Sequence, residues 1–266
     1  MHIIYIVTLS PVRKNRAFFM LNFMKQLYNK YTKQDHLVWE CLFERQVNNL
    51  PNKVAKEYLD CLENLQPNLN KTYIPNFNKL DVGLSKFEGW IIEVVPGLIP
   101  VDDFFSLLAN KKFCSSTWLR KMDQLDYLEE PDMFHDIFGH IPLLAHKPYA
   151  DFVAEFGKIG FAHAENEEIV KQLQRLYWFT IEFGLIRQEE ELKIYGAGII
   201  SSFSETNSIF QTKAIIKPFD LKEIIETDFE TDKLQECYFV IESFEQLYDS
   251  LKEYKMMLKN QTVLKD

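Results

Sequence analysis

The sequence predicts a mainly helical domain with a few short strands, an α+β fold. Of its 266 residues, 47% are hydrophobic and 26% are charged, as in a globular chain that buries one large core. Most segments repeat apolar residues with a helical period, and only short runs have the turn-bounded pattern of strands. No internal repeat or low-complexity linker divides the chain. We therefore expect one domain over residues 31–266, preceded by an N-terminal extension over residues 1–30.

Proline and glycine positions divide the first part of the chain. Pro51 interrupts a long run of helical periodicity, and Pro96 with Gly97 ends an apolar run. Acidic residues at 102 and 103 suit the first turn of a helix, because the helix dipole favours negative charge there. We expect, in order, two helices within 32–65, an Asn- and Pro-rich surface loop over 66–88, a strand within 88–100 and a helix over 101–113.

Helical periodicity dominates the remainder of the chain. Pro131 suits the first position of a helix, and Pro142 ends or bends that helix. We expect a loop over 114–130, helices over 131–144, 147–163 and 166–186, a glycine-rich turn with a short extended piece over 193–206, and then a helix, a strand and a helix over 221–227, 236–244 and 245–258.

Composition excludes several classes of protein. The net charge of −9 and the absence of a basic cluster argue against nucleic-acid binding. The apolar run at the N-terminus is too short to span a bilayer. It does not resemble a signal peptide either, because its basic residues follow the apolar run instead of preceding it, so we expect no membrane association. No pair of cysteines has C-x-x-C spacing, which favours free thiols in a reducing cytoplasm. The cysteines are Cys41, Cys61, Cys114 and Cys237.

Two histidines lie on the helix predicted over residues 131–144. His135 and His140 are five residues apart, which separates them by about 140° around an α-helix. Paired ligands on a helix usually stand three or four residues apart, so this pair needs a local distortion, for which Gly139 and Pro142 are suitable. Histidines on an apolar helix are more often core or surface groups, so the pair alone leaves a metal site open.

Glu182 lies within an almost wholly apolar run, where an unpartnered carboxylate would cost several kcal/mol. Either a metal ion or a buried salt bridge to Arg175 or Arg187 would remove that cost. Two imidazoles and one carboxylate suit non-heme iron(II) oxygen chemistry. Zinc in a hydrolase is the alternative. The common zinc peptidase motif H-E-x-x-H is absent, because Asp136 follows His135 and the second histidine comes one residue too late.

Arg120 precedes this helix. A guanidinium near a metal site can grip a carboxylate with two parallel hydrogen bonds. The alternative is a surface ion pair with Asp123 or Glu129.

Three stretches together resemble the aromatic amino acid hydroxylase family, most closely its short bacterial members that act on phenylalanine. They are YLEEPDMFHDIFGHIPLL, LYWFTIEFGLI and YGAGIISSFSE, and the resemblance extends from about Asp35 to Leu251. It implies a basket-like catalytic domain over 31–266. It also implies iron(II) held by His135, His140 and Glu182, with dioxygen and tetrahydrobiopterin or another reduced pterin as cosubstrates.

The resemblance assigns roles to further residues. Arg120 matches the arginine that binds the substrate carboxylate, and Trp178 matches the aromatic wall of the substrate pocket. Gly198 matches a glycine that leaves room for the substrate, and Ser201 matches a serine that supports the substrate and an iron-ligating histidine. The residues matching catalytic positions between pterin and iron are Glu130 and Pro131.

The pterin positions are implied in the same way. The segment Gly97, Leu98 and Ile99 matches the loop that follows the heterocycle. Phe104 matches the aromatic residue that stacks on the pterin, and Tyr177 matches a residue beside it. A flat heterocycle stacks well on a phenyl ring, although Phe104 can also be read as a core residue of its helix.

The resemblance favours L-phenylalanine as the substrate and L-tyrosine as the product. Trp178 disfavours a tryptophan hydroxylase. A tyrosine hydroxylase would have aspartate at the position that aligns with Thr231, but the neighbouring Asp232 keeps that alternative open. We further expect a monomer, whose released 4a-hydroxypterin is restored by a separate pterin-recycling enzyme.

Overall fold

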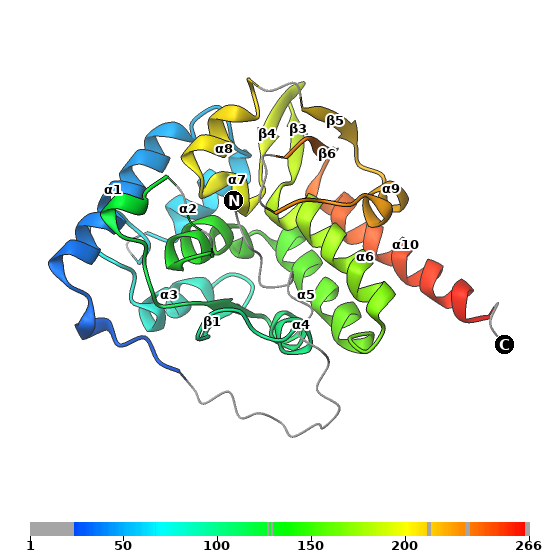
Figure 1. Ribbon diagram of the computed structural model, residues 1–266, viewed down its shortest axis with the longest axis horizontal. Coiled ribbons are helices and arrows are strands. Elements are labelled where there is room, and N and C mark those ends of the chain that lie inside the picture. Colours follow the sequence, from blue (N-terminus) through cyan, green and yellow to red (C-terminus); the bar gives the residue numbers. More distant parts are fainter. Residues whose placement is uncertain are drawn as a thin grey trace.

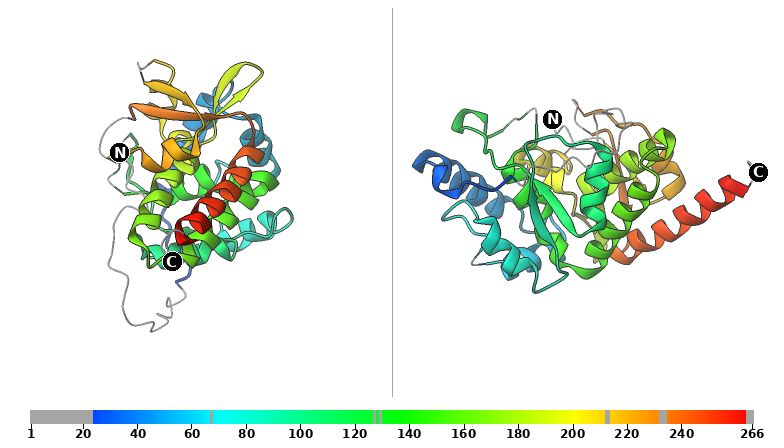
Figure 2. Two further views of the ribbon diagram at one scale, coloured as in Figure 1. Left: turned by 90° about the vertical axis from the view of Figure 1, so that its right-hand side faces the viewer. Right: turned by 90° about the horizontal axis from the view of Figure 1, so that it is seen from below.

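The computed structural model describes residues 24–66, 68–126, 128, 130–211, 214–231 and 235–263. Helices make up most of this part of the chain, and the strands form two small sheets (Figures 1 and 2). One continuous cluster of buried apolar side chains runs through both the helical and the sheet regions. The architecture is therefore the mainly helical α+β fold that the sequence predicts.

Helices α1 (Lys33–Asn49) and α2 (Lys56–Asn64) occupy the stretch in which two helices were predicted. A capping box between Thr32 and Asp35 starts α1, because each side chain accepts a hydrogen bond from the other residue's backbone N–H. Pro51 lies in the turn between the two helices, as expected from its missing N–H.

The segment 66–88 was predicted to be a surface loop, and this prediction is wrong for its second half. Helix α3 spans Phe77–Leu84. The Asn76 side chain caps it by accepting the N–H of Lys79, and Leu80 is buried on the inner face. The abundance of Asn and Pro obscured a short helix whose cap is itself an asparagine.

The smaller sheet joins β1 (Ile91–Val94) and β2 (Lys112–Ser115) in parallel. Helix α4 (Val101–Ala109) forms the crossover between them. The helix predicted over 101–113 is therefore too long at its C-terminal end. Lys111 adopts a left-handed backbone conformation, with φ of 56°, which breaks the helix and lets β2 begin.

Two segments predicted as continuous α-helices contain π-helical turns. The first is His135–His140, followed by a 3-10 turn at Pro142–Ala145. The second is Trp178–Glu182, which continues α6 (Glu167–Tyr177). Helix α5 (Lys147–Ala162) lies between these segments and was predicted correctly.

The larger sheet has the order β4–β3–β6–β5. Strands β3 and β4 form an antiparallel hairpin, whereas β6 runs parallel to both β3 and β5. Of the four strands of this sheet, only β6 was predicted in full. The helix predicted over 166–186 ends before β3 starts. The bounds are β3 Leu185–Gln188, β4 Glu191–Ile194, β5 Ile215–Pro218 and β6 Cys237–Ile241.

Short helices replace most of the glycine-rich turn predicted over 193–206. They are α7 (Ala197–Ile200) and α8 (Phe203–Ser208). Helix α9 (Leu221–Glu226) packs against α6, and α10 (Phe244–Val263) packs against α5 and then runs outward (Figure 1). Among the described residues, no helix is both long and apolar enough to cross a membrane.

Most of the expected N-terminal extension lies outside the described residues, which begin at residue 24. Residues just before α1 contact the segment that leads into α3. The Gln26 side chain donates to the carbonyl of Pro75 and accepts the N–H of Phe77, both at 2.9 Å. The Tyr28 hydroxyl donates to the carbonyl of Ile74 at 2.8 Å. The chain at 26–28 is therefore bound to the domain by specific hydrogen bonds.

Candidate metal centre

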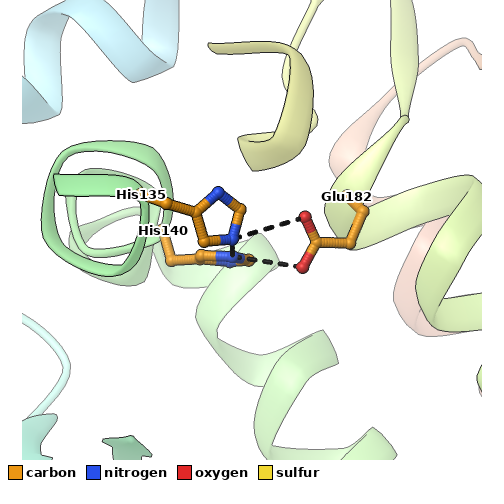
Figure 3. A group of neighbouring side chains, drawn as sticks. All are labelled: His135, His140 and Glu182. Carbon is orange, nitrogen blue, oxygen red and sulfur yellow. Dashed lines mark hydrogen bonds and ion pairs between the residues drawn. The ribbon is translucent and has the colours of Figure 1, made fainter. Parts of the chain in front are cut away.

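His135, His140 and Glu182 point toward one another in the interior (Figure 3). The two histidine Nε2 atoms are 3.1 Å apart. Glu182 Oε1 lies 3.2 Å from Nε2 of His140, and Oε2 lies 3.7 Å from Nε2 of His135. All three side chains are buried, and Glu182 is only 1% exposed. Two imidazole nitrogens and one carboxylate thus converge on a single point.

The π-helical turn resolves the spacing of the two histidines. A π-helix pairs residue i with residue i+5, so it holds one more residue per turn than an α-helix. The ends of the segment His135–His140 therefore lie on the same side of the chain. Gly139 permits this turn to pack closely, since a Cβ at this position would lie 2.9 Å from the carbonyl oxygen of Ala197.

Glu182 ends the second π-helical turn and approaches the histidines from the opposite side (Figure 3). The alternative of a buried salt bridge is not what the structure contains. Arg175 pairs with Asp228 at 2.6 Å, and Arg187 pairs with Glu242 at 3.4 Å. Glu182 is therefore directed at the two imidazoles.

Ser201 fixes the proton on His135. Its Oγ lies 2.9 Å from His135 Nδ1 and also donates to the carbonyl of Ala197 at 2.9 Å. A hydroxyl has one proton, so Oγ accepts from His135, and Nδ1 carries the hydrogen. The lone pair of Nε2 then faces the other two groups, as a metal ligand requires. The predicted supporting contact of Ser201 with a histidine is present in this geometry.

The donor set fits a divalent metal ion. Two imidazole nitrogens and a carboxylate directed at the same buried point are donor types that bind divalent metal ions. A cation would satisfy all three groups at once. Three protein ligands leave coordination positions open, which suits iron(II) oxygen chemistry and also matches a catalytic zinc site, so the donor set alone does not choose between the two metals.

Arg120 is buried and paired with Asp132, which was not among its predicted partners. Its Nε and Nη2 each donate to Asp132 at 2.8 Å, and its Nη1 donates to the carbonyl of Leu125 at 3.2 Å. The surface pair with Asp123 is absent, and Glu129 lies outside the described residues. Each terminal guanidinium nitrogen has a second N–H that these bonds do not use.

Asp132 was missed in the sequence, although it links Arg120 to the metal ligands. Its Oδ1 also accepts the backbone N–H of His135 at 3.1 Å, and its Oδ2 accepts the N–H of Arg120 at 3.0 Å. Asp132 stands three residues before His135, at the position of a helix N-cap. That spacing was the one feature of the sequence that indicated its role. The carboxylate therefore sets the distance between the arginine and the first histidine.

Trp178 lies in an aromatic stack at the start of the second π-helical turn. Its ring is 4.4 Å from those of both Phe183 and Phe229, nearly parallel to the latter at 13°. Its Nε1 donates to Gln235 Oε1 at 2.7 Å. Phe229 and Gln235 were not identified in the sequence, because they belong to a polar loop with no periodic pattern. Of the two residues that bear on the tyrosine hydroxylase alternative, Thr231 comes two positions after Phe229, and Asp232 lies outside the described residues.

Gly198 lies directly against the carboxylate ligand. A Cβ there would be 3.0 Å from Glu182 Oε2 and 3.1 Å from the Glu182 carbonyl oxygen. Glycine therefore lets α7 approach Glu182 closely, in addition to the role in leaving room for substrate that the sequence suggested.

The predicted pterin residues lie on the α4 side of the metal centre. Gly97, Leu98 and Ile99 form the loop between β1 and α4, with φ of 151° at the glycine. The Phe104 ring is fully buried and meets the Tyr177 ring edge-on at 5.6 Å. The Tyr177 ring lies 6.4 Å from that of His140.

Burial, assisted by the Glu182 carboxylate, raises the pKa of Tyr177 well above its ordinary value, so its hydroxyl stays protonated at neutral pH. Glu130 is exposed and Pro131 is buried, and both stand just before the turn that carries the histidines. The predicted residues therefore come from several elements: the loop between β1 and α4, α4 itself, the end of α6 and the segment before the first π-helical turn.

A mainly helical fold with a buried two-histidine, one-carboxylate face defines the class of non-heme metal proteins suited to oxygen chemistry. The family model for biopterin-dependent aromatic amino acid hydroxylases matches residues 20–265. The chain belongs to this family, as its motifs suggested.

Individual relatives agree with this assignment. The phenylalanine-4-hydroxylase of Ralstonia nicotianae is 44% identical over 86% of this chain and 72% of its own length. The Chromobacterium violaceum phenylalanine hydroxylase structure with iron(III) and oxidized 7,8-dihydrobiopterin is 42% identical, with a TM-score of 0.84 over 91% of this chain and 88% of that chain. The iron- and phenylalanine-bound structure of the same enzyme is 40% identical, with a TM-score of 0.81 over 87% and 84% of the two chains.

Proposed function

We propose that this chain is a phenylalanine 4-monooxygenase, which converts L-phenylalanine to L-tyrosine with dioxygen and a tetrahydropterin at an iron(II) centre. The observation that carries this proposal is the buried convergence of His135, His140 and Glu182 within a chain of this family. Relatives named phenylalanine-4-hydroxylase, at up to 44% identity, support the choice of substrate.

The reaction balances with the three proposed reactants. One atom of dioxygen becomes the hydroxyl oxygen at C4 of the phenylalanine ring, and the other leaves with the pterin as a 4a-hydroxypterin, which has supplied two electrons. Iron(II), when bound, supplies the redox chemistry that dioxygen requires. The protein's own task is to hold the reactants together and to keep water out.

The chain's residues divide this task. Ser201 and the Ala197 carbonyl hold His135 in the tautomer whose Nε2 can coordinate the metal. We propose that the outer edge of Arg120 binds the substrate carboxylate, because Asp132 fixes the inner edge at a set distance from His135. Trp178 then forms a wall for the substrate ring, and Gly198 lets α7 lie directly against Glu182.

The pterin is proposed to bind between α4 and the metal centre. The loop Gly97–Ile99 would follow the edge of the heterocycle, with Phe104 and Tyr177 as the aromatic neighbours. Glu130 and Pro131 are proposed to line the space between pterin and metal. The position of Tyr177, between Phe104 and the His140 ring, supports this arrangement.

One assay tests the proposal. The purified chain is incubated with iron(II), a tetrahydropterin, phenylalanine and heavy-isotope dioxygen, and the products are identified by mass spectrometry. We expect tyrosine carrying one heavy oxygen atom, and none from the variant Glu182→Gln, which keeps the shape of the ligand but removes its charge. Product from tyrosine or tryptophan with none from phenylalanine would assign a different substrate within the family. Activity that depends on zinc and survives iron removal would instead favour a hydrolase.

Further proposals concern the surroundings of the enzyme. We propose a monomer, because one chain supplies all three proposed metal ligands. A separate enzyme that dehydrates and reduces the 4a-hydroxypterin is proposed to act downstream, since the pterin leaves oxidized.

The four cysteines are free thiols, which supports a reducing location such as the cytoplasm. Light scattering of the purified protein tests the proposal of a monomer.

A further inference from the structure

The carbonyl of Phe138 lies inside the turn that carries both histidines. In a continuous α-helix it would accept the N–H of residue 142. That residue is Pro142, which has no N–H to donate. The hydroxyl of Tyr58 donates to this carbonyl at 2.7 Å, and Tyr58 belongs to a different helix, α2. A side chain distant in sequence thus satisfies a backbone group of the metal-binding turn.

Tyr58 is well placed to hold this turn. It is fully buried, and its ring meets the ring of Phe138 edge-on at 6.1 Å. Helix α2 also packs on the 3-10 turn that begins at Pro142. The ring and the hydroxyl therefore act on the same residue, from a helix that is itself fixed against the following turn.

The opposite side of the same peptide is also held. Gly139 follows Phe138, and a Cβ at Gly139 would lie 2.9 Å from the Ala197 carbonyl oxygen of α7. The backbone at 138–139 is thus enclosed between Tyr58 and α7. His140 comes next in the chain, so any shift of this peptide rotates its imidazole.

The two histidines are not supported in the same way. His135 has Ser201 on its Nδ1. Among the described residues, Nδ1 of His140 has no hydrogen-bond partner, and its ring packs on Phe113 at a centroid distance of 4.7 Å. Metal-binding imidazoles are usually oriented through the nitrogen that does not bind the metal. The orientation of His140 consequently depends on its backbone.

We propose that Tyr58 is a positioning residue of the metal centre, whose hydroxyl holds the Phe138 carbonyl and thereby directs His140 Nε2 toward the metal. The inference rests on the proposed function in one respect, that His135, His140 and Glu182 bind a metal ion. It adds a residue from α2 to a centre whose other named residues follow position 96.

The test compares Tyr58→Phe with Tyr254→Phe. The control also removes a buried tyrosine hydroxyl with a 2.7 Å bond, to Gln172 Oε1, but at the contact of α10 with α6. Anaerobic titration with iron(II) and with cobalt(II), against a competing chelator, gives the affinity of each variant. We expect Tyr58→Phe to bind both metals at least about 10-fold more weakly, as is typical when an outer partner of a ligand is removed. Tyr254→Phe should retain the affinity of the unmodified chain.

A rescue variant tests the route through the backbone. Pro142→Ala returns an N–H to position 142, so Tyr58→Phe/Pro142→Ala is expected to regain part of the lost affinity. The visible spectrum of the cobalt(II) form should change in Tyr58→Phe and return toward that of the unmodified chain in the double variant. The double variant also provides the measurement if Tyr58→Phe alone does not fold.

Two outcomes separate this inference from the proposed function. If the unmodified chain binds neither metal, the proposed function fails. If the unmodified chain binds metal and Tyr58→Phe has the same affinity and the same cobalt spectrum, the role of Tyr58 is refuted while the metal centre stands. An equal loss of affinity in Tyr254→Phe would also refute it, because the effect would then reflect general loosening of the fold.

Discussion

At the scale of single residues, Asp132 serves two sites at once. Its carboxylate binds the Arg120 guanidinium through two bonds and also accepts the backbone N–H of His135. Both members of the ion pair are buried. Charges taken out of water are tolerated only while they are paired, so removing one partner costs more than the pair itself contributes.

Arg120→Ala is therefore expected to affect folding as well as substrate binding. Loss of the guanidinium leaves Asp132 charged and buried, which should lower the free energy of unfolding by about 3–5 kcal/mol. The KM for phenylalanine should rise because the proposed carboxylate contact is lost. The double variant Arg120→Ala/Asp132→Asn should recover much of the stability while its KM stays high. Urea unfolding and steady-state kinetics measure both effects, and an unchanged KM in either variant would contradict the carboxylate role.

Residue type marked three metal-ligand candidates, and the family resemblance joined them into one ligand set with Ser201 as a support. Two further supports, Asp132 and Tyr58, were missed in the sequence. His135, His140 and Glu182 stand out because imidazoles and a carboxylate are unusual in apolar runs. Asp132 and Tyr58 act on backbone N–H and carbonyl groups, which every residue has and which leave no mark in the sequence. Such partners can be found only when the fold brings distant segments together.

At the scale of elements, the two π-helical turns account for the main errors in the predicted helices. The five-residue spacing of His135 and His140 does not place both side chains on one face of an α-helix. The sequence therefore indicated a local distortion, but it did not indicate that the distortion is a π-helical turn. The apolar run at 176–186 continued smoothly, because a buried helix and a buried strand share the same composition. It contains the end of α6, the second π-helical turn and the start of β3.

The hairpin between β3 and β4 turns through two residues with left-handed backbone conformations. Glu189 and Glu190 have φ of 50° and 64°, and Gln188 pairs with Glu191 across the strands. Positive φ at both central positions is the type I′ pattern, which Asn-Gly fits best. A residue with a long side chain costs roughly 1–2 kcal/mol in this conformation.

Glu189→Asn/Glu190→Gly is accordingly expected to raise the free energy of unfolding by about 1–3 kcal/mol, by relieving strain at both positions. The kcat and KM should not change, because the turn makes no contact with the metal centre. Glu189→Gln/Glu190→Gln is the matched control, since it removes the same charges but keeps the strain. Thermal or urea unfolding gives the answer, and equal gains in both variants would point to charge repulsion instead.

At the scale of the whole molecule, Asp81 connects α3 to the smaller sheet and makes stability depend on pH. Its Oδ1 accepts the N–H of Ile92 at 2.8 Å. Burial raises the pKa of Asp81 to about 6, although the bond from Ile92 opposes that rise. Between the unfolded pKa of about 4 and the folded pKa, the native state holds more protons than the unfolded state. This carboxyl group therefore makes the protein less stable as pH rises through that window.

Asp81→Asn should remove this dependence, because the amide oxygen can still accept the N–H of Ile92 but carries no charge. Because solvent screens a partly buried group, we expect a gain of roughly 1–2 kcal/mol over the unmodified chain at pH 7.5, and little gain at pH 4. Urea unfolding of both proteins at a series of pH values measures the difference. A gain of the same size at both ends of the series would show that ionization of Asp81 is not its cause.

The two π-helical turns also constrain how such a centre can change over generations. Each holds one residue more than an α-helical turn. The geometry of the site therefore depends on the number of residues in these two turns, and not only on which residues they are. Substitution can exchange one ligand at a time, whereas deleting a single residue rotates the rest of a helix by about 100° and carries every later contact with it. Insertions and deletions at 135–140 and 178–182 should consequently be far rarer than substitutions among homologues, and the spacing between ligands should outlast the identity of the residues around them.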